Sequence, residues 1–146
     1  MIATILRQSP VDERTRSSAW RQLSDILAQR GTQLTEFDVR RALHALALLR
    51  PQVSNSVRQE TALALAGHCR FAPLVALYAA DIPSVAAEML ATVQLPDADW
   101  LALLPSSTPV ARAVLAKRTY LSPEVRRALA SLGDSQPALP VTERLA

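Results

Sequence analysis

The chain has 146 residues, the size of one ordinary domain, and its hydrophobic content of 49% is that of a globular protein. Ala and Leu supply most of this content while aromatic residues make up only 4%, a mixture that favours helices over strands. The net charge of +3 is too small to identify a nucleic-acid-binding protein by itself, and the single cysteine excludes an internal disulfide and suits a reducing cytoplasm.

The sequence contains no segment that resembles a signal peptide or a transmembrane helix. Charged residues follow the N-terminus directly, at positions 12 to 14. The longest nearly apolar run, residues 42–49, is interrupted by His44 and is far shorter than the roughly 20 residues that cross a bilayer. We therefore expect a soluble, cytoplasmic protein with no membrane insertion.

Two helices are predicted in the first fifty residues. The first covers about residues 14–29, has apolar residues at helical spacing and ends before Gly31. The second begins at Thr35, where Asp38 takes the place of the usual Glu or Gln of a capping box, and runs to Arg50 before Pro51. These helices are less typical than the segments that follow them.

The rest of the chain repeats a short pattern, in which a valine lies just inside a helix start and a Leu-Ala pair follows one turn or more later. Helices with this pattern are expected from about residues 57, 83, 109 and 123, with further short helices at 72–80 and 97–104 between them. Proline and capping signals mark the starts at Thr108 and Ser122, and Gly133 is expected to end the last helix.

The spacing of these helices predicts how they stack. The first three valines, at positions 57, 85 and 110, recur about every 25–28 residues, which is enough for two short helices per repeat. The sequence therefore predicts an all-α fold, an α-solenoid of short antiparallel helix pairs with the valine and Leu-Ala positions packed between two layers. It is expected to form a single domain over residues 1–134, with repeats at 51–134 and a proline-containing linker or tail at 135–146.

Residues 85–134 carry the order of motifs that resembles a known family. They read Val-Ala-x-x-Met-Leu-Ala, then Leu-Pro-Asp-Ala-Asp-Trp-Leu-Ala-Leu-Leu, Pro-Val-Ala-Arg-Ala-Val-Leu-Ala-Lys-Arg and Leu-Ser-Pro-Glu-Val-Arg-Arg-Ala-Leu. This order is similar to a HEAT-like helical-repeat domain of unknown function from alphaproteobacteria. The resemblance implies a HEAT-like solenoid found alone or at the N-terminus of multidomain proteins such as sensor histidine kinases, and it brings no catalytic residues.

Several residues suggest chemistry, but each has a simpler structural explanation. His44 lacks the neighbours of a common phosphoacceptor histidine, and the adjacent His68 and Cys69 lack the further ligands of a zinc site. The acids at 97 and 99 lie at a predicted helix start, where capping and the helix dipole stabilise them. Trp100 is expected to pack between repeats, and the three glycines form no phosphate-binding loop. No catalytic residue, metal site or cofactor is predicted.

A late basic cluster is the candidate partner surface. It consists of Arg112, Lys117, Arg118, Arg126 and Arg127, with Glu124 the only acid in that stretch. The simpler interpretation is a solvated face with cations at helix C-termini. The functional interpretation is a surface that attracts an acidic protein segment or a phosphate backbone, in which Arg112 and Arg126 form a ridge on successive repeats.

Three functional hypotheses follow. The first is a non-catalytic regulatory module that binds a protein partner or another domain of its own chain in bacterial signal transduction, with a kinase core attached beyond Ala146 as one arrangement. The second is a nucleic-acid-binding helical repeat. The third is a small-molecule sensor whose ligand lies between the helix layers near Trp100 and Tyr78.

Overall fold

The computed structural model describes Ile2 and residues 12–134, and in this part of the chain the regular secondary structure is all helical, with no strand. It contains eight α-helices and three short 3-10 turns. The helices are α2 (Glu13–Arg30), α3 (Glu36–Leu49), α4 (Asn55–Ala66), α5 (Ala72–Ala79), α6 (Pro83–Leu90), α7 (Asp97–Leu103), α8 (Pro109–Ala116) and α9 (Pro123–Asp134). The predicted all-α fold is confirmed.

Hydroxyl side chains begin four of the helices, as their sequences indicate. Thr35 accepts a hydrogen bond from the backbone N–H of Asp38 at 3.0 Å, and Thr108 accepts one from Ala111 at 3.0 Å. Ser122 and Ser54 make the same kind of contact at the starts of α9 and α4. Each hydroxyl satisfies one backbone N–H that has no partner within its helix.

Two predictions about helix ends are wrong. α9 does not stop at Gly133 but continues through it to Asp134, because glycine permits the left-handed conformation that ends a helix without requiring it. The acids at the start of α7 do not cap it, since Pro96 is the N-cap and makes no side-chain hydrogen bond there. Asp97 and Asp99 instead lie in the first turn, where the helix dipole favours them. The predicted linker at 135–146 lies outside the described residues.

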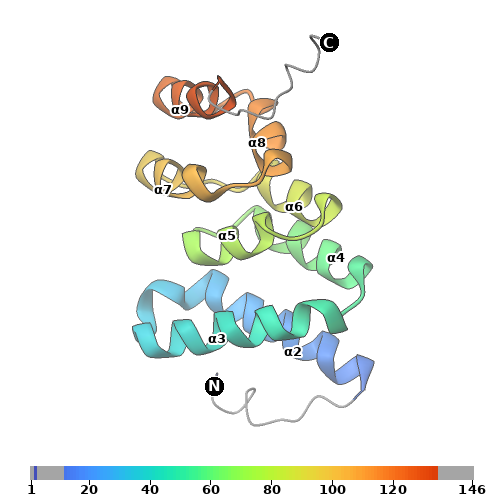
Figure 1. Ribbon diagram of the computed structural model, residues 1–146. Helices are drawn as coiled ribbons and strands as arrows, with labels where there is room; N and C mark the ends of the chain where they lie inside the picture. The colour runs from blue at the N-terminus through green and yellow to red at the C-terminus, as the bar shows by residue number, and fades with distance from the viewer. Residues whose placement is uncertain (1, 3–11, 135–146) are drawn as a thin grey trace.

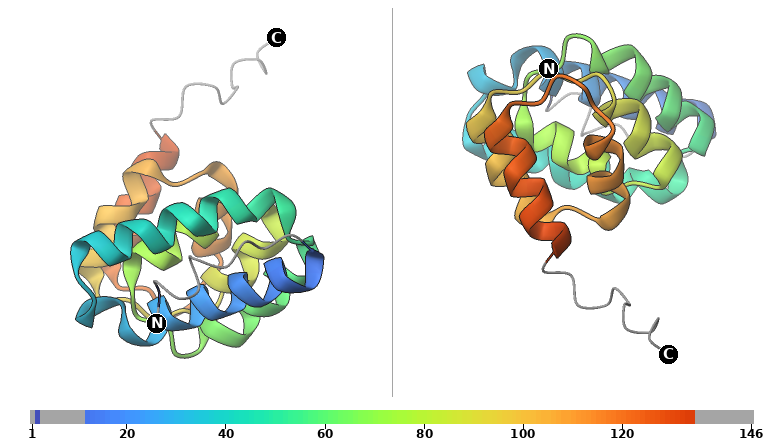
Figure 2. Two further views of the ribbon diagram at one scale, coloured as in Figure 1. Left: turned by 90° about the horizontal axis from the view of Figure 1, so that it is seen from below. Right: turned by 90° about the horizontal axis from the view of Figure 1, so that it is seen from above.

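The helices form two rows that follow the order of the chain (Figure 1). In one row α2, α4, α6 and α8 contact one another in succession, and in the other α3, α5, α7 and α9 do the same. Contacts of α2 with α3 and of α5 with α6 join the rows. Seen along the stack, α2 and α3 cover one end and α9 lies at the other (Figure 2).

The apolar core lies between the rows, and helix starts fix which residues enter it. Counted from the N-cap, the third helical residues of α4, α6, α8 and α9 are Val57, Val85, Ala111 and Val125, and all but Val57 are buried. Val110 is one residue out of this register and is 40% exposed. The prediction that every repeated valine and Leu-Ala pair is buried is therefore wrong at Val110. It is also wrong for the alanines of three Leu-Ala pairs, Ala91, Ala116 and Ala130, which are exposed.

The same prediction is also wrong in α4. Leu63 is 61% exposed and Ala64 is exposed as well, while the next pair, Leu65 and Ala66, is buried. The two pairs are two residues apart, which places them on different sides of a helix that turns 100° per residue. Sequence similarity between the repeated segments therefore identified the right helices but an incorrect register.

Candidate functional site

Two of the five cations predicted as a partner surface, Arg112 and Arg126, bind backbone carbonyls of nearby loops. Arg112 donates to the carbonyl oxygen of Ser107 at 2.6 Å, and Arg126 donates to the carbonyl oxygens of Leu121 and Arg118. Both side chains therefore fold back onto the loop before their own helix instead of forming a ridge. They lie on α8 and α9, which belong to different rows.

The same contact occurs before three helices: an arginine in the first turns of the helix binds the backbone carbonyl five residues earlier, in the preceding loop. Arg58 repeats at α4 what Arg112 and Arg126 do, donating to the carbonyl oxygen of Val53 at 2.6 Å and to that of Arg50 at 3.0 Å. We call Arg58, Arg112 and Arg126 the loop arginines. Each lies four residues after the N-cap hydroxyl of its helix, so one short motif closes three helix starts.

A longer sequence signal accompanies two of these arginines and was missed by sequence reasoning. Residues 50–58 read Arg-Pro-Gln-Val-Ser-Asn-Ser-Val-Arg and residues 118–126 read Arg-Thr-Tyr-Leu-Ser-Pro-Glu-Val-Arg. In both segments the last arginine binds the carbonyl of the first. The first arginine in turn reaches another element: Arg50 donates to the carbonyl oxygen of Leu77 in α5 at 2.7 Å, and Arg118 to that of Val93 in the loop after α6 at 2.6 Å.

The strongest charged contact of the described chain is a buried cluster between α4 and the loop after α5. Arg58 binds both carboxylate oxygens of Asp81 at 2.9 Å, and Arg50 lies 3.6 Å from the same carboxylate. The side chains of Asp81 and Arg58 are only 1% and 6% exposed. A hollow of about 660 Å³ borders the cluster, with Glu13 in its lining. Because two acids balance the two cations, this hollow does not select for anions.

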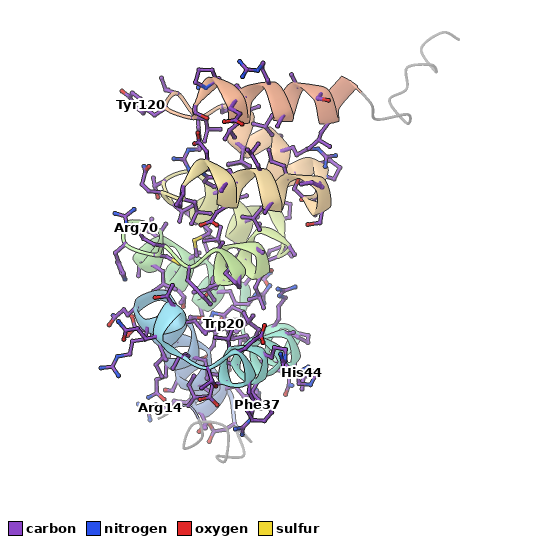
Figure 3. The ribbon with its side chains drawn as sticks, turned by 90° about the vertical axis from the view of Figure 1, so that its left-hand side faces the viewer. Arg14, Trp20, Phe37, His44, Arg70 and Tyr120 are labelled. Carbon is purple, nitrogen blue, oxygen red and sulfur yellow. The ribbon has the colours of Figure 1, made fainter. Side chains whose placement is uncertain are left out.

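Lys117 and Arg118 are the two predicted cations that the structure brings together in a hollow. A groove of about 580 Å³ between α6 and α8 is lined by apolar Ala87, Ala91 and Val114 and by polar residues that include Lys117, Arg118 and Tyr120. We call it the α6–α8 groove. Tyr120 is 91% exposed and projects outward from the loop after α8, as Figure 3 shows. The residues lining this groove include two cations and no acid.

Arg118 links this groove to the interior. Its guanidinium lies 5.5 Å from the centroid of the Trp100 ring, and burial lowers the pKa of Arg118 from its ordinary value. It also donates to the carbonyl oxygens of Leu90 and Val93, at the end of α6 and in the loop that follows. Arg127, by contrast, is exposed on α9 and does not line the groove.

Trp100 is buried, as predicted, and lines a small cavity between the two rows. The cavity has a volume of about 50 Å³ and is lined mainly by Ala76, Ala79, Trp100, Leu103, Leu104 and Ala111. We call it the Trp100 cavity. Tyr78 does not line it: the Tyr78 hydroxyl lies 2.7 Å from that of Ser24, and burial raises the pKa of this phenol. Trp100 and Tyr78, the two residues predicted to border one small-molecule site, therefore do not line the same cavity.

The histidines and the cysteine do not converge. His44 is exposed on α3 and points away from the core, as Figure 3 shows, and His68 is exposed as well. Cys69 is buried, so the two adjacent side chains face different environments. Over the described residues, no three His, Cys, Asp or Glu side chains gather as metal ligands would, and no helix has the length and apolar character of a membrane span.

Cys69 is expected to be chemically inert in the folded protein. Its residue is 1% exposed and burial raises the pKa of the thiol, whereas the thiolate is the reactive form. Iodoacetamide at pH 8 should label native Cys69 at least about tenfold more slowly than the urea-unfolded chain, because labelling requires local opening. A Cys69→Ser variant carrying Thr119→Cys, at an exposed position, should label at similar rates folded and unfolded. Rapid labelling of native Cys69 would contradict its burial.

Comparison of the whole chain with protein-family models, curated proteins and solved structures gives no match.

Proposed function

We propose that this chain is a non-catalytic interaction module, a HEAT-like solenoid of short helix pairs whose α6–α8 groove binds an acidic segment of a protein partner or of another domain of its own polypeptide. The setting that we propose is bacterial signal transduction, for which the support is the resemblance of residues 85–134 to domains found ahead of sensor kinases. The observation that carries the proposal is the composition of the groove, which combines an exposed tyrosine, two cations and an apolar floor.

The order of helix contacts supports the solenoid part of this proposal. Each helix of a row contacts the next helix of that row, as expected when every repeat is covered mainly by its neighbours. The two nine-residue segments that begin at Arg50 and Arg118 support it further, because both place an arginine, an N-cap serine and a second arginine in the same relation to a helix start.

The chemistry of the groove supports an acidic protein segment as the occupant. Ala87, Ala91 and Val114 leave a floor without bulky or charged side chains, on which a small aliphatic side chain can pack. Lys117 and Arg118 place positive charge beside that floor, and no lining residue opposes it. Tyrosine is among the residues that dominate binding energy at interfaces, and Tyr120 is almost fully exposed.

Peptide binding tests this proposal. The probe is a fluorescein-labelled octapeptide that alternates Glu and Leu, and the control probe has Gln at every Glu position. We expect the acidic probe to bind the wild-type chain more tightly than the control. Its affinity should fall with added salt, because salt screens the exposed charges. K117E should weaken binding of the acidic probe at least about tenfold, since it places like charges together. Tyr120→Ala should weaken the binding of both probes.

Arg127→Glu is the matched control for K117E. It makes the same change of charge at an exposed cation outside the groove lining, so we expect less than about a threefold effect from long-range electrostatics alone. Equal losses in the two variants would mean that net charge alone attracts the probe. Equal binding of both probes to the wild type would also reject the acidic-segment proposal.

Nucleic acid is the less favoured partner because the loop arginines are already engaged. Arg112 and Arg126 donate to backbone carbonyls, so fewer cations are free to neutralise phosphates. A gel shift with duplex DNA at low salt distinguishes the two partners. A shift that weakens in an Arg126→Glu, Arg127→Glu variant would favour nucleic acid over the acidic protein segment.

A further inference from the structure

The Trp100 cavity is an unfilled apolar space between α5 and α7 of one row and α6 and α8 of the other. A cavity of about 50 Å³ exceeds the roughly 10–15 Å³ that one water molecule occupies, so it has room for a small organic group. Protein interiors are otherwise close-packed, with few voids of this size in a domain. This space is too small for a typical metabolite pocket of about 300–1,000 Å³ but large enough for a branched alkyl group.

Its lining offers almost nothing to a polar ligand. Four alanines and four leucines surround the indole of Trp100, and no lining residue is charged. The hydroxyls at the rim are already engaged: Ser107 donates to the carbonyl oxygen of Leu104 at 2.6 Å, and Thr108 accepts from the N–H of Ala111. Water inside such a space would lack hydrogen-bond partners, so a group without polar atoms is favoured.

The cavity is also accessible from one edge of the molecule. Ala80 and Ser106 are exposed members of its lining, which places the mouth between the end of α5 and the loop before α8. A molecule can therefore insert an apolar end and leave a polar end near Ser106. An alkyl group there would pack against the methyl groups and the indole of the lining, and these dispersion contacts favour binding.

We propose that the Trp100 cavity binds the short branched alkyl end of a small uncharged molecule. The site is separate from the α6–α8 groove and does not depend on the function proposed for it. The two sites are neighbours: Arg118 of the groove covers the ring of Trp100 and donates to the carbonyl oxygen of Leu90, and both of these residues line the cavity. For a ligand of about four heavy atoms we expect a dissociation constant on the order of 1 mM or weaker.

Fluorescence of Trp100 tests the proposal directly, because the chain has only two tryptophans. In a Trp20→Phe background Trp100 is the sole tryptophan and reports on the cavity. The probe is isobutanol, and the matched control probe is 2-methyl-1,3-propanediol, which adds one hydroxyl to the same carbon skeleton. We expect a saturable change with isobutanol at millimolar concentrations and a response at least about tenfold weaker with the diol, because the extra hydroxyl loses its hydration.

A variant that fills the cavity provides the structural control. Ala79→Leu adds a side chain to the lining and should abolish the isobutanol response while leaving the chain folded. Ala47→Leu makes the same change at an exposed position on α3 and should leave the response intact. An Ala79→Leu variant that responds like the parent would overturn the proposal, as would a response that rises linearly without saturation.

Methyl NMR of the unmodified chain gives a second measurement that does not depend on any variant folding. Isobutanol should shift the methyl signals of the cavity lining, above all those of Ala76, Ala79, Leu103, Leu104 and Ala111. The methyls of Leu48 and Leu63, which are exposed on α3 and α4, should shift much less. Shifts of equal size at the cavity and at these exposed leucines would indicate general solvent effects and reject the site.

Discussion

Replacement of Asp81 by Asn is expected to lower the free energy of unfolding by about 3–5 kcal/mol, which is the range for breaking a buried ion pair by removal of one partner. The Asp81 side chain is 1% exposed and accepts both hydrogen bonds from Arg58, while Arg50 lies 3.6 Å away. Without the carboxylate, a guanidinium that is 6% exposed remains buried with no opposite charge. Urea denaturation followed by circular dichroism measures the loss.

Two further variants separate the ion pair from unrelated effects of Asp81→Asn. Asp25→Asn changes an exposed carboxylate whose partner is Gln29 on the same helix, and surface changes of this kind cost less than about 0.5 kcal/mol. Arg58→Met combined with Asp81→Leu removes both charges of the pair and should recover part of the loss, because the buried Arg58 guanidinium is removed together with its carboxylate and only the less buried Arg50 loses its partner. A cost below about 1 kcal/mol for Asp81→Asn would show that the cluster contributes little to stability.

Replacement of Trp20 by Ala is expected to have an effect of similar size, about 3–5 kcal/mol. Trp20 is fully buried in α2 and its ring centroid lies 5.5 Å from that of Tyr78 in α5, so it fills space between the two rows. Removal of the indole leaves a cavity that the surrounding helices can close only in part. The same denaturation experiment measures the change.

Trp20→Phe and Phe37→Ala are the comparisons for this prediction. Trp20→Phe keeps an aromatic ring next to Tyr78 and should cost less than half as much as Trp20→Ala, which makes it usable as the background for Trp100 fluorescence. Phe37 is 58% exposed on α3, so Phe37→Ala should cost less than about 1 kcal/mol. Equal costs for Trp20→Ala and Phe37→Ala would be incompatible with the described core.

The cationic side chains of this protein have two different roles: some bind backbone carbonyls, and others remain exposed to solvent. Arg58, Arg112 and Arg126 close the loops before their helices, since each binds the carbonyl directly before the N-cap. Carbonyl groups near a helix start need partners when water cannot reach them, and a charged donor forms one of the stronger hydrogen bonds available. Cations available to a partner are therefore fewer than the sequence suggests, and Lys117 and Arg127 are the exposed members of the cluster without such a loop contact.

The α6–α8 groove and the Trp100 cavity lie on either side of α8. Val114 and Lys117 of the groove and Ala111 and Leu115 of the cavity come from one short helix or the residue that ends it. A partner that binds Arg118 and moves it away from Trp100 would uncover one face of the indole ring that lines the cavity. Binding of the acidic peptide should therefore change Trp100 fluorescence in the Trp20→Phe background only if the two sites are coupled.

Over residues 12–134, the sequence by itself determined the number, the order and nearly the bounds of the α-helices. These features depend on contacts within about four residues, such as the hydrogen bond from Asp38 to Thr35, and such contacts are readable from neighbouring letters. It also determined that Trp100 is buried, because large apolar side chains at helical spacing face a core. The sequence-based predictions were wrong about where α9 ends and about which residues of α4 and α8 face the core. Capping signals and repeat similarity are preferences that packing can override.

Only the tertiary structure decided which charged residues are free and where hollows form. Arg118 binds a carbonyl 28 residues away and Asp81 pairs with an arginine 23 residues away, and no local pattern specifies such partners. The α6–α8 groove likewise exists because two helices separated in the chain lie side by side with alanine and valine between them. A guanidinium binds whichever oxygen the fold brings to it, so the role of an arginine is settled by packing and not by its neighbours in the chain.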